Sequence, residues 1–189
     1  MKIKKFTKTI VLVAILTLAS GSFCYADTFT GGRSSAVYKA YFDSSVSSYG
    51  YSPHYMAGMS NWNNISSKVS LSITTSTSDY PDKYYIGNTA TNGLWGQTAI
   101  YKKNLLGQIV TAQTTDTWVY STIVLYDNQM KAYNMNAAEV KSTATHEVGH
   151  TLSLAHTTAS VESVMREGAI QFIGPTTYDI TQLKAKWGN

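Results

Sequence analysis

The sequence has only one cysteine, Cys24, among 189 residues. Residues 1–26 have the form of a secretory signal peptide, with a lysine-rich start, an apolar run over residues 10–19 and a small residue, Ala26, at the expected cleavage point. Cleavage there removes Cys24, so we expect residues 27–189 to fold with neither a disulfide nor a redox-active thiol. The exported chain must then depend on its hydrophobic core and on any metal that it binds.

Long apolar segments are also missing. The run over residues 10–19 is too short to span a bilayer, which makes a membrane anchor the weaker alternative to a cleaved leader. We therefore expect a secreted, extracellular protein with no stable membrane association. Residues 27–189 are numerous enough to form one domain with an ordinary core. We expect the exported protein to be a monomer.

A charge excess of one sign is absent once the leader is set aside. The chain has 15 basic and 11 acidic residues, and the leader contains four lysines and no acid, which leaves 11 of each. The sequence pI of about 9.0 therefore reflects the leader. It does not indicate a nucleic-acid partner.

Histidine, in contrast, is concentrated: His146, His150 and His156 fall within eleven residues. Residues four apart lie one turn apart on a helix, so His146 and His150 can reach one ion. Glu147 completes an HExxH pattern, in which two histidines bind Zn²⁺ and the glutamate acts as general base on a metal-bound water. The pattern predicts a zinc cofactor and a zinc hydrolase.

A catalytic zinc usually has three protein ligands and an open fourth position. His156 is the nearest candidate for the third ligand, but a straight helix would place it about 9 Å beyond His150 along the axis. The helix must therefore end between them, and Ser153 is the residue there with some tendency to leave a helix. Glu162 and Glu167 are competing candidates for the third ligand.

This spacing resembles the HExxHxxGxxH motif of the metzincins, a clan of zinc proteases. The chain matches the motif at four positions: His146, Glu147, His150 and His156. It departs from the motif at Ser153, where the clan has a glycine. If the bend there requires a positive φ, a serine costs on the order of 1 kcal/mol, which metal binding can outweigh. The resemblance, closest to secreted bacterial proteins of the matrixin type, implies a metalloendopeptidase that cleaves protein or peptide substrates.

The resemblance implies further features downstream of the histidines. Metzincins have a methionine-containing turn beneath the zinc, and Met165 is the candidate for it. Glu167 stands where astacins and serralysins have an additional tyrosine ligand, so no tyrosine switch is expected. In matrixins an aspartate ties the final helix to the methionine turn. Asp179 could do this, although a favourable charge at a helix N-terminus also explains it.

Two segments are expected to contact the substrate. In metzincins the strand before the active-site helix forms the sheet edge that binds an extended peptide, which implies that role for residues 121–126. An interior position for this strand is the alternative. Residues 166–177 are expected to form the wall of the pocket for the side chain after the cut bond. Ile170, Phe172 and Ile173 suggest an apolar lining for it.

Residue patterns along the chain predict an α+β fold, a single metzincin-like catalytic domain. Alternating or β-branched runs predict strands over residues 37–42, 68–74, 84–86, 93–101 and 117–125. In the second of these, Val69, Leu71 and Ile73 are expected to share one buried face. Together the strands are expected to form a mixed, twisted sheet.

Three helices are predicted from their start signals and apolar spacing. The first has Ser52 as N-cap, Pro53 in its first turn and a buried stripe, formed by Tyr55, Met59 and Trp62. The active-site helix begins with a capping box, formed by Asn136 and Glu139. The last helix opens at Tyr178 and directs three side chains to the core: Ile180, Leu183 and Trp187. His54, isolated from the other histidines, is expected to be a surface or packing residue.

Two alternatives to a protease remain at this stage. The chain could hydrolyse a non-peptide amide or ester, or it could be an inactive secreted binding domain stabilised by zinc. The sequence gives no support for calcium binding, because the four acidic residues considered as ligands lack the spacing of a known calcium loop. These acids are Asp79, Asp82, Asp116 and Asp127.

Overall fold

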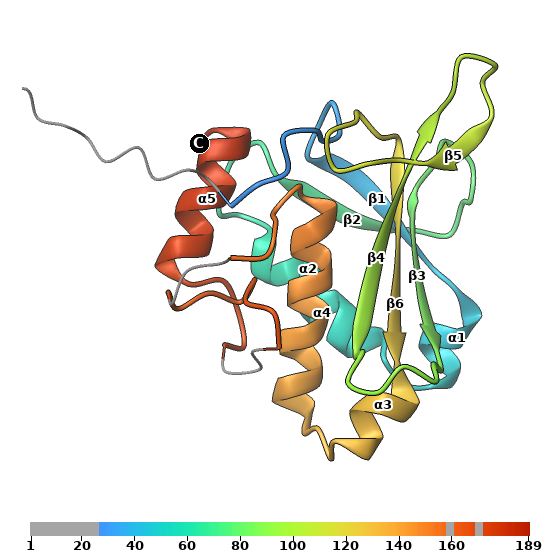
Figure 1. The fold of residues 1–189 in the computed structure, drawn as a ribbon, viewed down its shortest axis with the longest axis vertical. Helices are drawn as coiled ribbons and strands as arrows, with labels where there is room; N and C mark the ends of the chain where they lie inside the picture. The colour runs from blue at the N-terminus through green and yellow to red at the C-terminus, as the bar shows by residue number, and fades with distance from the viewer. Residues whose placement is uncertain (1–26, 158–160, 169–171) are drawn as a thin grey trace, which may run out of the picture.

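A mixed six-stranded sheet forms the frame of the molecule, with three of its helices, α2, α4 and α5, together to one side of it in Figure 1. In the computed structural model the described residues are 27–157, 161–168 and 172–189, so the predicted leader and Ile170 lie outside them. Over these residues the chain is a small α+β domain. Its elements are β1 (Val37–Phe42), α1 (Ser44–Ser48), α2 (Ser52–Trp62), β2 (Ser70–Thr74), β3 (Asp82–Gly87), β4 (Gly96–Lys103), β5 (Ile109–Thr111), β6 (Tyr120–Tyr126), α3 (Asp127–Ala132), α4 (Ala137–Thr151) and α5 (Thr177–Trp187). None of these helices is both long and apolar enough to cross a membrane.

The strands are arranged in the order β2-β1-β3-β6-β4-β5. The four from β2 to β6 pair in parallel, whereas β4 runs antiparallel to β6 and β5 runs antiparallel to β4. The short β5 pairs only with the last part of β4, Tyr101 to Lys103. The first part of β4 therefore lies at an edge of the sheet.

The position of β6 corrects one expectation. Residues 121–126 were expected to form the substrate-binding edge, but β6 lies between β3 and β4, with a partner on each side. The alternative of an interior strand is confirmed. The edge next to α4 belongs instead to β4, because the short β5 pairs only with the last part of this strand.

The core lies between the sheet and the helices. In α2 the predicted stripe is confirmed, since Tyr55 and Trp62 are fully buried and Met59 nearly so. The Trp62 indole donates a hydrogen bond to the carbonyl oxygen of Thr145 at 2.8 Å, which ties α2 to α4. The helix begins one residue earlier than expected, with Ser52 as its first helical residue and Tyr51 at the cap.

Two other details of the predicted elements differ. Val69 and Leu71 are buried as expected, but the side chain of Ile73, near the end of β2, is 47% exposed. The last helix starts one residue before the predicted Tyr178, and Leu183 is its fully buried side chain. Trp187 packs against the core, whereas Ile180 is only half-buried.

The start of α4 is as predicted. The Asn136 side chain accepts hydrogen bonds from the backbone N–H groups of Ala138 and Glu139, and the Glu139 carboxylate accepts one from the Asn136 N–H. These contacts satisfy backbone donors that a helix N-terminus otherwise leaves unpaired. They fix where the helix begins and hence which of its residues face the sheet.

The end of α4 produces the bend that the third histidine needs. Ser153 has φ +67°, and its N–H bonds to the His150 carbonyl while the Leu154 N–H bonds to that of Gly149. This is the Schellman pattern, in which a left-handed residue closes the helix. The predicted helix end between His150 and His156 is confirmed, and the bend there does require a positive φ at Ser153.

The segment at residues 27–32, which we call the N-terminal strap, runs beside this bend. Its Phe29 N–H bonds to the Ser153 carbonyl at 2.8 Å, and the Ala155 N–H bonds to the Asp27 carbonyl at 2.8 Å. The Lys186 ammonium of α5 donates to the carbonyl oxygens of Phe29 and Gly31, both at 2.7 Å. The strap thus joins the last helix to the loop that follows α4.

Candidate metal centre

The three predicted histidines meet at one point. The Nε2 atoms of His146, His150 and His156 lie 3.1 Å from one another in all three pairings. His146 and His150 come from α4, and His156 reaches them because the chain bends at Ser153. An ion at the Zn–N distance of about 2.0–2.1 Å can contact all three nitrogens at once.

The second nitrogen of two rings is held by a backbone carbonyl. His146 Nδ1 lies 2.8 Å from the Val164 oxygen, and His150 Nδ1 lies 2.8 Å from the Leu154 oxygen. A carbonyl only accepts, so each Nδ1 carries the proton and each Nε2 presents a lone pair. Lone pairs directed at a common point repel one another unless a cation lies between them. The arrangement therefore fits a metal ion and fixes the ring orientations that it needs.

The environment also keeps these rings neutral. Burial lowers the pKa of His146 to about 4, with the nearby His156 adding to the effect. Burial likewise lowers the pKa of His150 well below its ordinary value, helped by His146. Metal ligation requires unprotonated imidazole, so the fold prepares both rings for binding at neutral pH.

Glu147 lies beside the histidines and is only 6% exposed. Burial raises the pKa of its carboxyl group to about 7, although a hydrogen bond from Thr98 acts in the opposite direction. The Thr98 hydroxyl of β4 lies 2.7 Å from Glu147 Oε2. A Cβ on Gly96 would lie 2.7 Å from Glu147 Oε1, so the glycine leaves the space that the carboxylate occupies. A carboxyl group with a pKa near 7 suits proton transfer at neutral pH.

Met165 lies in a tight turn next to the histidines. The Arg166 N–H bonds to the Ser163 carbonyl at 3.3 Å, which closes the turn, and the carbonyl of Val164 within it holds His146. The Met165 side chain is 3% exposed and packs on Gly149, where an added Cβ would lie 2.4 Å from the methionine sulfur. Gly149 thus allows the turn to approach α4 closely.

Asp179 joins α5 to this turn. Its carboxylate accepts hydrogen bonds from the Val164 N–H at 2.9 Å and from the Ser163 hydroxyl, and it also caps α5 through the Thr176 N–H at 2.8 Å. Both explanations considered for Asp179 therefore apply. The tie to the turn and the helix cap use the same buried carboxylate.

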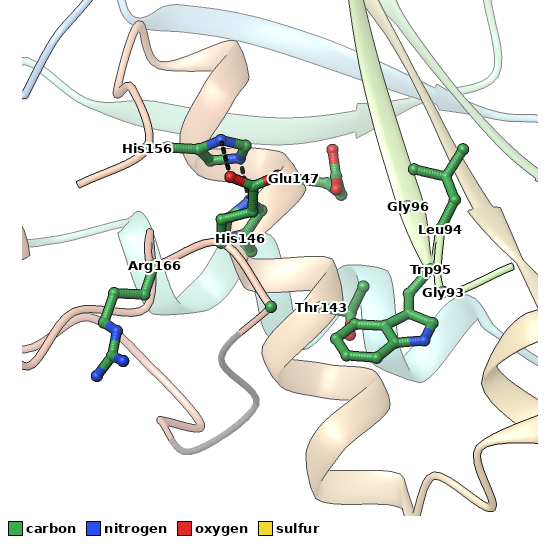
Figure 2. Close-up of a pocket in the computed structure, with 11 residues that line it drawn as sticks. Gly93, Leu94, Trp95, Gly96, Thr143, His146, Glu147, His156 and Arg166 are labelled. Carbon is green, nitrogen blue, oxygen red and sulfur yellow. Dashed lines mark hydrogen bonds and ion pairs between the residues drawn. The ribbon is translucent and has the colours of Figure 1, made fainter. Parts of the chain in front are cut away.

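A cavity of about 290 Å³ opens beside the histidines and Glu147. Figure 2 shows Leu94 and Gly96 on one side of it and Arg166 on the other. Arg166, Glu167 and Gly168 line it, as expected for the predicted wall. The expected apolar lining is wrong for two of its residues: Phe172 packs against the core, and Ile173 is 51% exposed. Ile170 lies outside the described residues.

A second cavity, of about 320 Å³, adjoins the first and is lined by His150, His156 and Glu147. Phe29, Leu94 and Ile100 give it apolar walls. The Phe29 ring stacks on that of His150 with centroids 5.9 Å apart and an interplanar angle of 17°. Sequence reasoning missed Phe29, Thr98 and Gly96, because each reaches the site from a distant part of the chain and none belongs to a recognisable motif.

The competing candidate ligands do not reach the three Nε2 atoms. Among the described residues, the only group of three or more side chains suited to a metal ion is the histidine triad. Glu167 is 85% exposed at its side chain and lies 4.0 Å from the outer nitrogen of His156, Nδ1. His54 packs on the Tyr51 ring, in agreement with the predicted packing role.

The acids considered for calcium are dispersed. Asp82 pairs with Arg33, Asp116 with Lys102 and Asp127 with Lys131, so three of the four already have basic partners. Within the part of the chain that the structure describes, they form no metal-binding group.

In comparisons with known proteins, no protein-family model matches the sequence, and no curated protein matches it.

Proposed function

We propose that the chain is a secreted zinc-dependent endopeptidase of the metzincin, matrixin-like type. The observation that carries the proposal is the set of three imidazole nitrogens 3.1 Å apart, with the buried carboxylate of Glu147 beside them and a cavity alongside. Three ligands suit a catalytic zinc site, whereas structural zinc usually has four protein ligands. The described residues supply three.

His146, His150 and His156 would hold the metal. Bound by these three neutral imidazoles, zinc would supply a Lewis acid that acidifies water and polarises a carbonyl group. Glu147 accepts the proton of the attacking water and returns it to the amine that leaves when the peptide bond breaks. The Thr98 hydroxyl keeps the Glu147 carboxylate in position for both transfers.

The edge of β4 supplies a binding surface for an extended peptide. Residues 96–99 pair with β6 on one side, and among the described residues no strand pairs with them on the other. A peptide added there would gain main-chain hydrogen bonds as an additional strand. Thr98 connects this edge directly to Glu147, so a peptide on β4 would pass the histidine triad.

The test replaces Glu147 with glutamine in protein 27–189. The Glu147→Gln variant should keep its zinc, because the three ligands are unchanged, and should lose at least about a hundredfold in kcat on casein, the scale of one general base. Zinc content is measured by atomic absorption. Glu162→Gln, which alters a glutamate outside the histidine triad, serves as control and should cleave like the parent. Casein cleavage by Glu147→Gln at the parental rate would refute the role of this residue.

Phenanthroline separates the protease from the two alternatives. Peptide cleavage that stops on chelation and returns with added zinc supports the proposal. Hydrolysis of small amides or esters without peptide cleavage would favour the non-peptide hydrolase. Loss of the fold on chelation, with no activity before it, would favour a zinc-stabilised binding domain.

A further inference from the structure

The second cavity owes one wall to the N-terminal strap. Phe29 is the strap residue that lines it, opposite Leu94 and Ile100 of the segment entering and forming β4. The Phe29 ring also meets Trp118 edge-on, with centroids 6.2 Å apart, so it is held from behind by a buried aromatic residue. The wall is therefore a fixed surface and lies directly against the metal-binding ring of His150.

Four hydrogen bonds attach the strap to α5, besides its backbone bonds to the loop after α4 and to residues 114–118. Lys186 donates to two strap carbonyls, the Asp27 N–H donates to the Gln182 side chain at 3.0 Å, and the Tyr178 hydroxyl donates to the Asp27 carboxylate at 2.7 Å. Of these α5 side chains, Lys186 is the one that contacts the backbone of Phe29 itself. On the opposite side, the Gly31 N–H bonds to the Thr114 carbonyl at 2.8 Å. The backbone of Phe29 is thus held at both of its polar groups, its N–H by the Ser153 carbonyl and its carbonyl by the Lys186 ammonium.

The two cavities adjoin each other along β4 and share Glu147 and His156 in their walls. Both are lined by Leu94 and Gly96, but only the first by Gly93 and Trp95 and only the second by residues 97, 98 and 100, so β4 runs from the first toward the second. A peptide paired antiparallel to β4 would pass the second cavity first and the first cavity last. The second cavity then receives a side chain that precedes the cut bond.

We propose that Phe29 determines specificity on the amino side of the cut bond: its ring selects an apolar substrate side chain, and Lys186 is the positioning residue that holds it there. This inference rests on the proposed peptidase function. The chemistry follows from the three apolar side chains in the cavity walls, those of Phe29, Leu94 and Ile100, which lie beside the rings of His150 and His156. An apolar side chain buries its surface there, whereas glycine leaves the cavity unfilled.

The experiment profiles zinc-loaded protein 27–189 against peptide libraries randomised on each side of the cut bond. In the Phe29→Ala variant, the ratio of kcat/KM for leucine over glycine at the selected position before the cut should fall about tenfold. Preferences after the cut should not change. Phe29→Leu keeps an apolar wall and should retain most of the ratio. Tyr49→Ala, which truncates a 45% exposed aromatic residue in the turn after α1, is the control for loss of an aromatic side chain.

Lys186→Met tests the positioning role, because it keeps an apolar stem and removes the donors to Phe29 and Gly31. The same ratio should fall while zinc content stays at one ion per chain, since His150 remains held by the Leu154 carbonyl. An unchanged ratio in Phe29→Ala, or an equal fall on both sides of the cut, would overturn the role of Phe29. An unchanged ratio in Lys186→Met would overturn that of Lys186.

The two proposals fail in different ways. If the parent cleaves no peptide, or cleaves in the presence of phenanthroline, the peptidase function is wrong and the specificity inference falls with it. If the parent is a chelator-sensitive peptidase and Phe29→Ala retains the parental ratio, only the inference is wrong.

Discussion

Glu147 is a carboxyl group that the fold removes from water at a cost in stability. It is buried, it accepts one side-chain hydrogen bond from Thr98, and no basic side chain forms an ion pair with it among the described residues. An ionised carboxylate in such a place is poorly solvated, which is why its pKa rises. The carboxyl group that we propose for proton transfer therefore weakens the metal-free fold.

This cost should depend on pH. The pKa of Glu147 rises from its ordinary 4.5 to about 7 in the folded protein, so the folded state binds a proton more tightly than the unfolded state between these values. The carboxyl group destabilises the protein fully above pH 7, and the effect disappears as the pH falls toward 4.5. In metal-free protein, Glu147→Gln should raise the free energy of unfolding by about 3 kcal/mol at pH 8 and by little at pH 4.5.

Urea unfolding at several pH values measures this difference. Glu162→Gln provides the matched control. A Glu147→Gln stabilisation that is the same at pH 8 and pH 4.5 would contradict the raised pKa.

At this scale the sequence predicted the metal ligands and not the residues that arrange them. His146, Glu147 and His150 follow from helical spacing alone, and His156 required only that the helix end in between. Thr98 lies 49 residues from Glu147 in the chain, and Phe29 comes from the strap. Their roles depend on which strand and which segment the fold places beside α4, and no local rule contains that information.

At the scale of secondary-structure elements, the C-terminal end of α4 requires a backbone conformation that is unfavourable for its residue, Ser153. The bend that returns His156 to the triad needs the left-handed conformation at Ser153, which costs a residue with a Cβ roughly 1 kcal/mol. The Ser153 hydroxyl is also buried and has no hydrogen-bond partner among the described residues. The hydrogen bonds that close α4 and the strap contact to the Ser153 carbonyl maintain a conformation that the residue itself disfavours.

Ser153→Gly should therefore stabilise the protein by about 1 kcal/mol, because glycine adopts the positive φ freely. Activity should stay near the parental level, since the ligand positions do not change. Ser153→Ala is the matched control: it removes the hydroxyl but keeps the Cβ, so it should gain nothing from the backbone. Thermal unfolding compares the three proteins. A glycine variant that is no more stable than the alanine variant would show that the left-handed backbone carries no cost here.

Elements with local sequence signals were predicted well, but the order of the strands in the sheet was not. The capping box of α4 and the buried stripe of α2 depend on residues within a few positions of one another, and both are confirmed. The edge was assigned to β6 instead of β4, because strand order depends on pairings between distant segments. Ile73 shows the same limit: alternation places it on the face of Leu71, but the strand ends where the core no longer covers it.

Across the whole molecule, the proposed metal site joins parts of the chain that the sequence separates. Its ligands come from α4 and from the loop after it, the loop pairs with the strap, and the strap is attached to α5. Without disulfides in residues 27–189, this region has no covalent link to hold it together. Ligand binding to the folded state alone adds stability in proportion to the logarithm of ligand concentration over Kd.

Zinc should thus raise the melting temperature of protein 27–189. At a free zinc concentration one hundred times Kd the gain is about 2.7 kcal/mol, or several degrees for a chain of this size. His156→Ala should lose most of this increase, whereas His54→Ala, which alters the histidine outside the triad, should keep it. Differential scanning calorimetry with and without chelator measures the shift. An equal shift in both variants would exclude His156 as a ligand.

The short open stretch of β4 limits what such an enzyme could attack. Residues 96–99 span about 13 Å when extended, so a target must release at least four consecutive residues from its own hydrogen bonds before it can lie there. Intact sheets and helices cannot meet this condition without local unfolding. Susceptibility would then follow the looseness of the target more than its composition, and well-folded neighbours in the same medium would escape digestion.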